Sequence, residues 1–228
     1  MTLPPPSRSL RAAPVPQCEF AMIDTPFSLT IRVCNHTMTP LLLASTSPHR
    51  KALLQRLGLE FRSVAPFIDE AHRAAETPLG RANRLALAKA RAGANHAQGA
   101  HVVIGSDQVA HIDNNLLDKP ETHARAVAQL QLMSGRCVEF LTAVCIIAGQ
   151  EIAHDCIRTL VTMRRLSDHE IQRYIAHESV LDCAASIRCE GLGITLFESL
   201  DTPDPTALIG LPLMATARIL RRFGFALP

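Results

Sequence analysis

Hydroxyl and basic side chains are concentrated in residues 44–51, directly after a short apolar run. Ser47 suits the N-cap of a helix, so a helix is predicted to begin at this point. The free backbone N–H groups and the positive end of such a helix favour a bound phosphate. Ser45, Arg50 and Lys51 would add donors and positive charge. The same segment would also serve as an ordinary capped helix start with two solvated cations.

A single acid, Asp107, follows the apolar run at residues 101–105. An acid placed directly after a buried strand lies where α/β folds bind their ligands. Such a carboxylate could hold a divalent cation or accept a proton from water. An aspartate that only forms a turn is the alternative interpretation.

Carboxylates and lysines elsewhere in the chain could complete a phosphate site. Asp69 and Glu70 form an acidic pair in a predicted loop, and hard cations such as Mg²⁺ need oxygen ligands of this kind. Lys89 and Lys119 could neutralise phosphate oxygens. Glu190 precedes two closely spaced glycines and could bind the edge of a base. Taken one at a time, the acidic pair and the lysines are better explained as a solvated loop and two surface lysines, and the glycines also suit a simple turn.

Together these residues supply the acids, the base and the cations of a phosphoryl-transfer site, because that chemistry relies on positioning and charge neutralisation. Several motifs of other enzyme classes are absent from the sequence: G-x-G-x-x-G, G-x-x-x-x-G-K-[ST], H-E-x-x-H and G-x-S-x-G. A dinucleotide enzyme, a P-loop ATPase, a zincin and an α/β-hydrolase are therefore disfavoured.

The bulk composition is that of a globular protein. Of the 228 residues, 47% are hydrophobic and 19% are charged, which is enough apolar material for a sizeable core. The net charge of +2 predicts no nucleic-acid partner, because such partners require a basic surface. No apolar stretch reaches the roughly 18 residues of a membrane span. The seven cysteines include no C-x-x-C pair, so we expect reduced thiols and a reducing compartment.

Apolar periodicity predicts alternating strands and helices from Leu41 onward. Because strands and helices intermix, the fold class is α/β, and the predicted hairpins make the sheet mixed. Strands are expected at 41–44, 61–65, 101–105, 109–112, 116–117, 138–148 and 152–163. Helices are expected from 48 to 57, from 78 to about 98, from 122 to 133, after a capping box at 167–170, and from 212 to 223.

The N-terminal segment differs from the rest of the chain. Residues 1–37 hold six of the fifteen prolines and sustain no helix or strand period. We expect a disordered or loosely attached extension there. Met38 is a candidate start of the functional unit, which then spans residues 38–228.

The chain resembles the Maf-like nucleotide pyrophosphatases, and specifically the subfamily acting on 7-methyl-GTP, in five segments that occur in the same order. These are A-S-T-S-P-H-R at 44–50, D-E at 69–70, G-S-D-Q at 105–108, D-K-P at 118–120 and C-E-G-L-G-I at 189–194. The resemblance implies an elongated α/β fold with a mixed sheet and a central cleft, similar to that of inosine triphosphate pyrophosphatases.

The resemblance also implies an activity and a set of site residues. The reaction is hydrolysis of 7-methyl-GTP to 7-methyl-GMP and pyrophosphate, with a divalent metal, Mg²⁺ or Mn²⁺, as cofactor. A cytoplasmic location and a homodimer are implied with it. Asp107 is then the proton acceptor, and Glu70 and Asp107 hold the metal. The phosphates are bound by Ser45, Arg50, Lys89 and Lys119, and the base is selected by His49, Gln108 and Glu190.

Base specificity rests on the last three of these positions. Gln108 and Glu190 follow the 7-methyl-GTP pattern. The sister subfamily acting on dTTP and UTP usually has Thr and Gln there, with Arg in place of His49. A dTTP or UTP pyrophosphatase is therefore the alternative enzyme. A non-catalytic regulator of septum formation, a process with which the wider family is associated, is the alternative outside enzymes.

The chain departs from the subfamily pattern at four positions. His49 stands where the subfamily usually has Trp or Tyr, and an imidazole stacks less well on a cationic purine. Asp118 replaces a glycine before Lys-Pro. Ala185 and Arg188 replace a glycine and a lysine. These changes leave the reaction class in place and bear on the choice of base.

Overall fold

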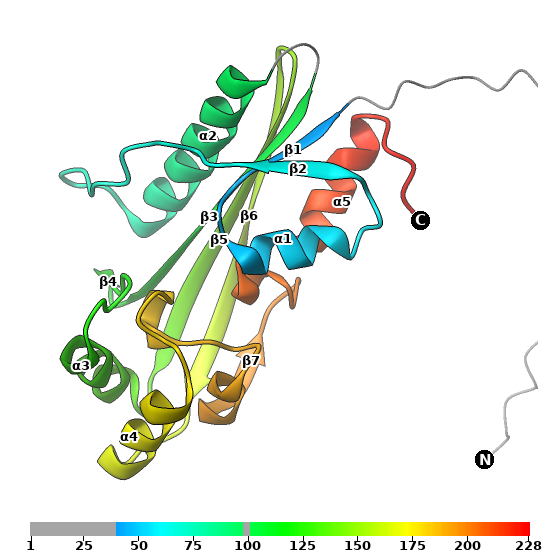
Figure 1. Cartoon of the computed structure of the whole chain (residues 1–228). Coiled ribbons are helices and arrows are strands. Elements are labelled where there is room, and N and C mark those ends of the chain that lie inside the picture. Colours follow the sequence, from blue (N-terminus) through cyan, green and yellow to red (C-terminus); the bar gives the residue numbers. More distant parts are fainter. Residues whose placement is uncertain (1–39, 98–100) are drawn as a thin grey trace, which may run out of the picture. The chain divides into compact units, whose positions relative to one another are not determined.

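A computed structural model describes residues 40–97 and 101–228. The N-terminal extension, the candidate start at Met38 and the predicted end of the second helix at residue 98 lie outside them. Within the described residues one mixed sheet has the strand order β2-β1-β3-β5-β6-β7, with β4 paired to β3, which confirms the α/β class (Figure 1). The strands are β1 (Leu41–Ala44), β2 (Phe61–Val64), β3 (Val102–Ile112), β4 (Asn115–Leu116), β5 (Cys137–Ala148), β6 (Glu151–Met163) and β7 (Phe197–Asp201).

Helices were predicted at the positions where the structure has them. The α-helices are α1 (Pro48–Gln55), α2 (Pro78–His96), α3 (His123–Met133), α4 (Asp168–His177) and α5 (Leu213–Arg222). Ser47 caps α1 by accepting the N–H of Arg50, and Ser167 and Glu170 form the predicted capping box of α4. Three short 3₁₀ helices (Ala184–Ser186, Leu192–Leu196 and Ala207–Ile209) and the strand β7 were not predicted.

Helices cover both faces of the sheet (Figure 1). Along β5, alternate side chains face opposite layers, as strand geometry requires. Ala143 and Cys145 pack against the alanine stripe of α2. Val144 and Ile146 pack in a cluster with leucines and isoleucines of α1 and α5. Further along the strands, a third cluster joins Phe140 to α3 and α4. In the described part of the chain, no helix is both long enough and apolar enough to cross a membrane.

The centre of the sheet is where its strand directions change. β1 pairs in parallel with β2 and with β3, whereas β3, β5, β6 and β7 pair antiparallel. The pairing of β1 with β3 ends at Leu43 and Ile104, although β3 continues to Ile112. The end of β1 therefore places the loop that leads into α1 beside the middle of β3.

One sequence prediction about β3 was wrong. The strand does not end at Gly105, and Asp107 does not follow it in a turn. Asp107 lies inside β3, opposite Ala143 of β5. The glycine and the polar residues after it suggested a break, but a continuous ladder with β5 overrides the local preference. Gly105 marks a close approach of the helix α2 to the strand instead of a strand end.

We predict that Gly105→Ala destabilises the fold by about 3 kcal/mol, in the range of overpacked cores. An added Cβ would lie 2.3 Å from the carbonyl oxygen of Ala86 and 2.4 Å from the backbone nitrogen of Ala90. Neither backbone atom can move without displacing α2. The urea midpoint of unfolding measures the loss, with an unchanged m-value as evidence that only stability has changed.

The matched control for this prediction is Gly58→Ala. Its added Cβ meets nothing within 4 Å, but its φ of 68° is left-handed. That conformation alone costs an alanine about 1 kcal/mol. Equal losses in the two variants would contradict a close approach of α2 at Gly105.

Candidate active site

A cleft of about 790 Å³ opens in the described part of the chain, which lies in the size range of small-molecule sites. All nine site residues that the family resemblance implies line this cleft: Ser45, His49, Arg50, Glu70, Lys89, Asp107, Gln108, Lys119 and Glu190. Lys51 and Asp69, which the sequence also suggested, do not line it. Asp69 is the neighbour of Glu70 in the chain. Its carboxylate accepts the N–H of Ala71 at 2.8 Å. The acidic pair read from the sequence therefore contributes one carboxylate to the cleft.

The loop between β1 and α1 forms one wall. The side-chain oxygen of Ser45 accepts the N–H of Ser47 at 3.1 Å, so the serines shape the loop before the helix begins. Arg50 donates from Nε to the carbonyl oxygen of Gly210 at 2.8 Å. Burial lowers the pKa of Arg50, while the charges of Asp107 and Glu70 raise it. An arginine remains protonated under such shifts, so this wall carries a fixed positive charge.

Lys89 joins the two carboxylates of the site. Its Nζ lies 2.6 Å from Asp107 Oδ1 and 2.9 Å from Glu70 Oε1. Lys89 and Asp107 are each only 6% exposed, whereas the side chain of Glu70 is 56% exposed. Lys89 reaches Asp107 because α2 packs directly against β3 at Gly105. At this distance the buried ammonium and the buried carboxylate form an ion pair at the base of the site.

The ionisation of Glu70 follows from its surroundings. Burial raises its pKa, but the hydrogen bond and charge of Lys89, with the charges of Lys119 and Arg50, bring the pKa below its ordinary value. Glu70 therefore stays ionised at a pH where a free glutamate begins to protonate. Around Lys89 the cleft thus holds two carboxylates, Glu70 and Asp107, with several cations nearby, which suits a phosphate chain accompanied by a cation.

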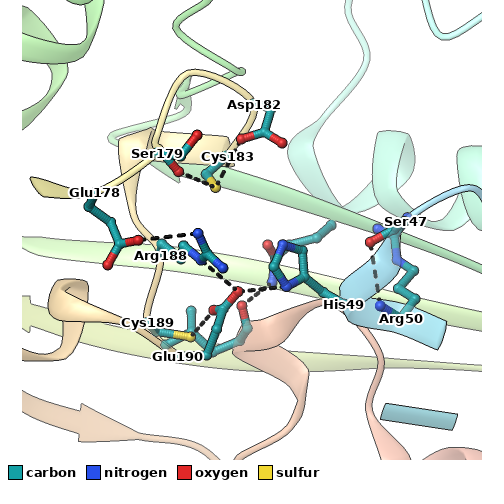
Figure 2. Close-up of polar contacts among 12 residues, drawn as sticks. Ser47, His49, Arg50, Glu178, Ser179, Asp182, Cys183, Arg188, Cys189 and Glu190 are labelled. Atoms are coloured by element: carbon teal, nitrogen blue, oxygen red, sulfur yellow. Dashed lines mark hydrogen bonds and ion pairs between the residues drawn. The ribbon is translucent and has the colours of Figure 1, made fainter. Parts of the chain in front are cut away.

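Gln108 and Glu190 present acceptors at another part of the cleft. The Nε2 of Gln108 lies 2.9 Å from the carbonyl of Leu208 and 3.0 Å from that of Ala207. Its amide oxygen is then the atom left to meet a ligand. Glu190 Oε1 lies 2.8 Å from His49 Nδ1 and 3.6 Å from Arg188 Nε. Figure 2 shows His49 and Glu190 pointing toward each other.

The cysteine beside these residues does not add a nucleophile. Cys183 lines the cleft and is a free thiol. Burial, and secondarily the nearby Asp182, raises the pKa of Cys183 to about 12. A thiol with so high a pKa carries almost no thiolate near neutral pH. The chemistry of the cleft therefore falls to its carboxylates and cations.

Several departures from the resembled pattern have a structural account. Ala185 has a φ of 55°, a left-handed conformation that explains why a glycine suits this position. Arg188 pairs with Glu178 and lies near Glu190. Asp118 pairs with Arg81, whose Nη2 lies 3.3 Å from Asp118 Oδ1.

The cleft lining also includes residues that were missed at the sequence level, among them Arg81 and Phe67. Arg81 lies on α2, four residues before Leu85 and eight before Lys89, and all three line the cleft. That helical spacing was a signal that could have found it. Phe67 lines the cleft with 85% of its surface exposed. It lies in a loop without periodicity, so no sequence pattern indicated its position.

With this geometry in view, the chain can be placed among known proteins. Residues 40–223 match the family described as Maf-like protein, and the chain belongs to that family. It is similar to the 7-methyl-GTP pyrophosphatase of Xanthomonas oryzae pv. oryzae (strain MAFF 311018), with 52% identity over 191 residues, 84% of this chain and 100% of that protein. It is also similar to the 7-methyl-GTP pyrophosphatase of Albidiferax ferrireducens, with 50% identity over 81% of this chain and 93% of that protein.

Among solved structures, a nucleoside-triphosphatase (dITP/XTP pyrophosphatase) of Mycobacterium abscessus aligns with 81% of this chain and 95% of its own length. The sequence identity is 19% and the TM-score is 0.39.

Proposed function

We propose that this protein hydrolyses 7-methyl-GTP to 7-methyl-GMP and pyrophosphate. The observation that carries the proposal is the buried Lys89–Asp107 pair, with Glu70, at the centre of a nucleotide-sized cleft. The relatives with this activity in their names are about half identical in sequence over more than four-fifths of the chain. A guanine edge presents N–H donors, and Glu190 offers an acceptor-only carboxylate for them.

In the proposed mechanism, Asp107 removes a proton from a water molecule. Asp107 Oδ1 accepts from Lys89, and the second carboxylate oxygen takes the proton. The water oxygen forms a bond to the α-phosphorus, the bond from that phosphorus to the bridging oxygen breaks, and pyrophosphate leaves. Arg50, Lys89 and Lys119 lie in the same cleft and neutralise the developing charge.

A divalent cation, Mg²⁺ or Mn²⁺, is part of the proposal. In the described residues no three His, Cys, Asp or Glu side chains gather as a metal site. The two carboxylates that share Lys89 nevertheless fit, because phosphate-handling Mg²⁺ sites use one or two carboxylates and take their other ligands from phosphates and water. Glu70 and Asp107 would hold the ion, which would supply charge neutralisation at the phosphate oxygens.

A cytoplasmic location and a homodimer are proposed with this activity. The five cysteines in the described residues are free, which supports a reducing compartment. Light scattering on the purified protein tests the dimer.

We predict pyrophosphate release that depends on a metal and is fastest with 7-methyl-GTP. The measurement is a panel of 7-methyl-GTP, GTP, dTTP, UTP, CTP and ITP, each with Mg²⁺, with Mn²⁺ and with EDTA. Turnover is expected to disappear in EDTA, because the charge of the triphosphate is then opposed only by side chains. A preference for dTTP or UTP would keep the reaction and overturn the assigned base. No turnover with any nucleotide would favour the regulator instead.

A further inference from the structure

Arg81 is a cleft residue to which the mechanism above gives no role. Its side chain is 13% exposed, and Nη2 pairs with Asp118 at 3.3 Å. Its Nη1 is buried and has no hydrogen-bond partner within the described residues. A guanidinium offers five N–H donors in a rigid fork. Since a buried donor without an acceptor is unfavourable, Arg81 is poised to bind an anion.

Arg84 shows how an arginine on the same helix is satisfied when its role is structural. It donates from Nε and from Nη2 to the two carboxylate oxygens of Glu76, and from Nη2 to the carbonyl of Ala71. Arg84 does not line the cleft, whereas Arg81 does. The two arginines are three residues apart, so the difference between them comes from their surroundings and not from their helix.

The position of Arg81 indicates which anion it meets. Arg81, Leu85 and Lys89 lie on one face of α2, and all three line the cleft. At 1.5 Å per residue, Arg81 is about 12 Å along the helix from Lys89. Lys89 pairs with Asp107, the residue proposed to activate the water that attacks the α-phosphorus. Through Asp118, Arg81 reaches the loop that carries Lys119. Arg81 thus places a positive charge in the cleft away from the Lys89–Asp107 pair, where a phosphate chain that extends beyond the point of attack would meet it.

Asp118 alone does not satisfy the anion-binding capacity of Arg81. The side chain of Asp118 is 56% exposed, so solvent screens its charge. One exposed carboxylate at 3.3 Å from Nη2 leaves Nη1 of the guanidinium fork without an acceptor among the described residues. Phosphate oxygens match such a fork with two parallel hydrogen bonds.

We propose that Arg81 binds the β- and γ-phosphates of the substrate, the part that leaves as pyrophosphate. The proposal rests on the proposed triphosphate hydrolysis and assigns a further phosphate-binding residue to the same cleft. In the absence of substrate, Asp118 holds the guanidinium as a competing acceptor. The phosphates displace Asp118 when they bind.

The test is calorimetric binding of inorganic pyrophosphate, and of 7-methyl-GMP, to the full-length protein and three variants. Arg81→Gln is expected to weaken pyrophosphate binding by about 30-fold, which corresponds to about one hydrogen bond to a charged group. Binding of 7-methyl-GMP is expected to change less than about twofold, because the monophosphate does not reach Arg81. Asp118→Asn is expected to tighten pyrophosphate binding by about threefold, because it removes the competing charge.

Arg84→Gln is the matched control. It removes a structural ion pair from the same helix, so it lowers the melting temperature and leaves pyrophosphate binding unchanged. The proposal is overturned if Arg81→Gln binds pyrophosphate as the wild type does, if it loses pyrophosphate and 7-methyl-GMP equally, or if the wild type binds no pyrophosphate at millimolar concentration. Equal weakening by Arg81→Gln and Asp118→Asn would also overturn it, because the pair would then act as one structural unit.

These outcomes separate the phosphate subsite from the proposed reaction. If Arg81→Gln loses pyrophosphate binding although the wild type hydrolyses no nucleotide, the subsite stands and the reaction fails. If the wild type hydrolyses 7-methyl-GTP and Arg81→Gln does so with unchanged kcat/KM, the reaction stands and the subsite fails.

Discussion

Asp107→Asn is expected to lower kcat by roughly 10³-fold while the protein stays folded, in the range that a general base contributes. Asparagine has the shape of aspartate, and its amide oxygen can still accept the hydrogen bond that Lys89 now donates at 2.6 Å. What it loses is the basic site for the proton of the attacking water. Single-turnover pyrophosphate release measures the chemical step, and calorimetric binding of 7-methyl-GTP shows whether the substrate site survives.

Asp69→Asn is the matched control for that variant. Asp69 lies beside Glu70 in the chain, but its carboxylate faces the N–H of Ala71 and not the cleft. An asparagine oxygen can accept the same hydrogen bond, so kcat is expected to stay within about twofold. Near-normal turnover in Asp107→Asn, or a large loss in Asp69→Asn, would place the proton acceptor on a different residue.

Much of the framework that positions Asp107 could be predicted from the sequence. Buried strands such as Leu41–Ala44 and capped helix starts such as Ser47-Pro48 are set by local patterns, and the structure has both. The continuity of β3 through Gly105 could not be predicted locally. It depends on pairing with β5, a strand about forty residues away in the chain, and such pairing overrides local propensity.

Nine cleft residues could be named from the sequence, but their pairings could not. The sequence indicated that Lys89, Glu70 and Asp107 could act together, and the structure joins them through Nζ of Lys89. The sequence did not indicate that His49 and Glu190 contact each other, because most of the chain separates them. The same holds for Arg81 and Asp118. These pairings follow from the order of the strands, which a single sequence specifies only through the complete fold.

The contact between His49 and Glu190 bears on the choice of base. His49 Nδ1 lies 2.8 Å from Glu190 Oε1, so a base that binds Glu190 through this oxygen must displace the imidazole. Arg188 lies 3.6 Å from the same oxygen and compensates part of the carboxylate charge. A purine that carries a positive charge from 7-methylation competes with His49 better than a neutral purine does. The charge of Glu190 is therefore expected to favour 7-methyl-GTP over GTP.

Glu190→Gln is expected to lower kcat/KM for 7-methyl-GTP by about 100-fold and for GTP by about tenfold. Both substrates lose a charged acceptor for their N–H donors, at about 1.5–3 kcal/mol. Only 7-methyl-GTP also loses attraction between unlike charges, which at 4 Å is about 1–4 kcal/mol between bulk water and a protein surface. The ratio of the two kcat/KM values, measured at one pH and salt concentration, isolates this second effect. Equal losses with both substrates would show that Glu190 binds the guanine edge without responding to the charge of the methylated base. Selectivity for 7-methyl-GTP over GTP would then have to come from stacking of the His49 ring on the base.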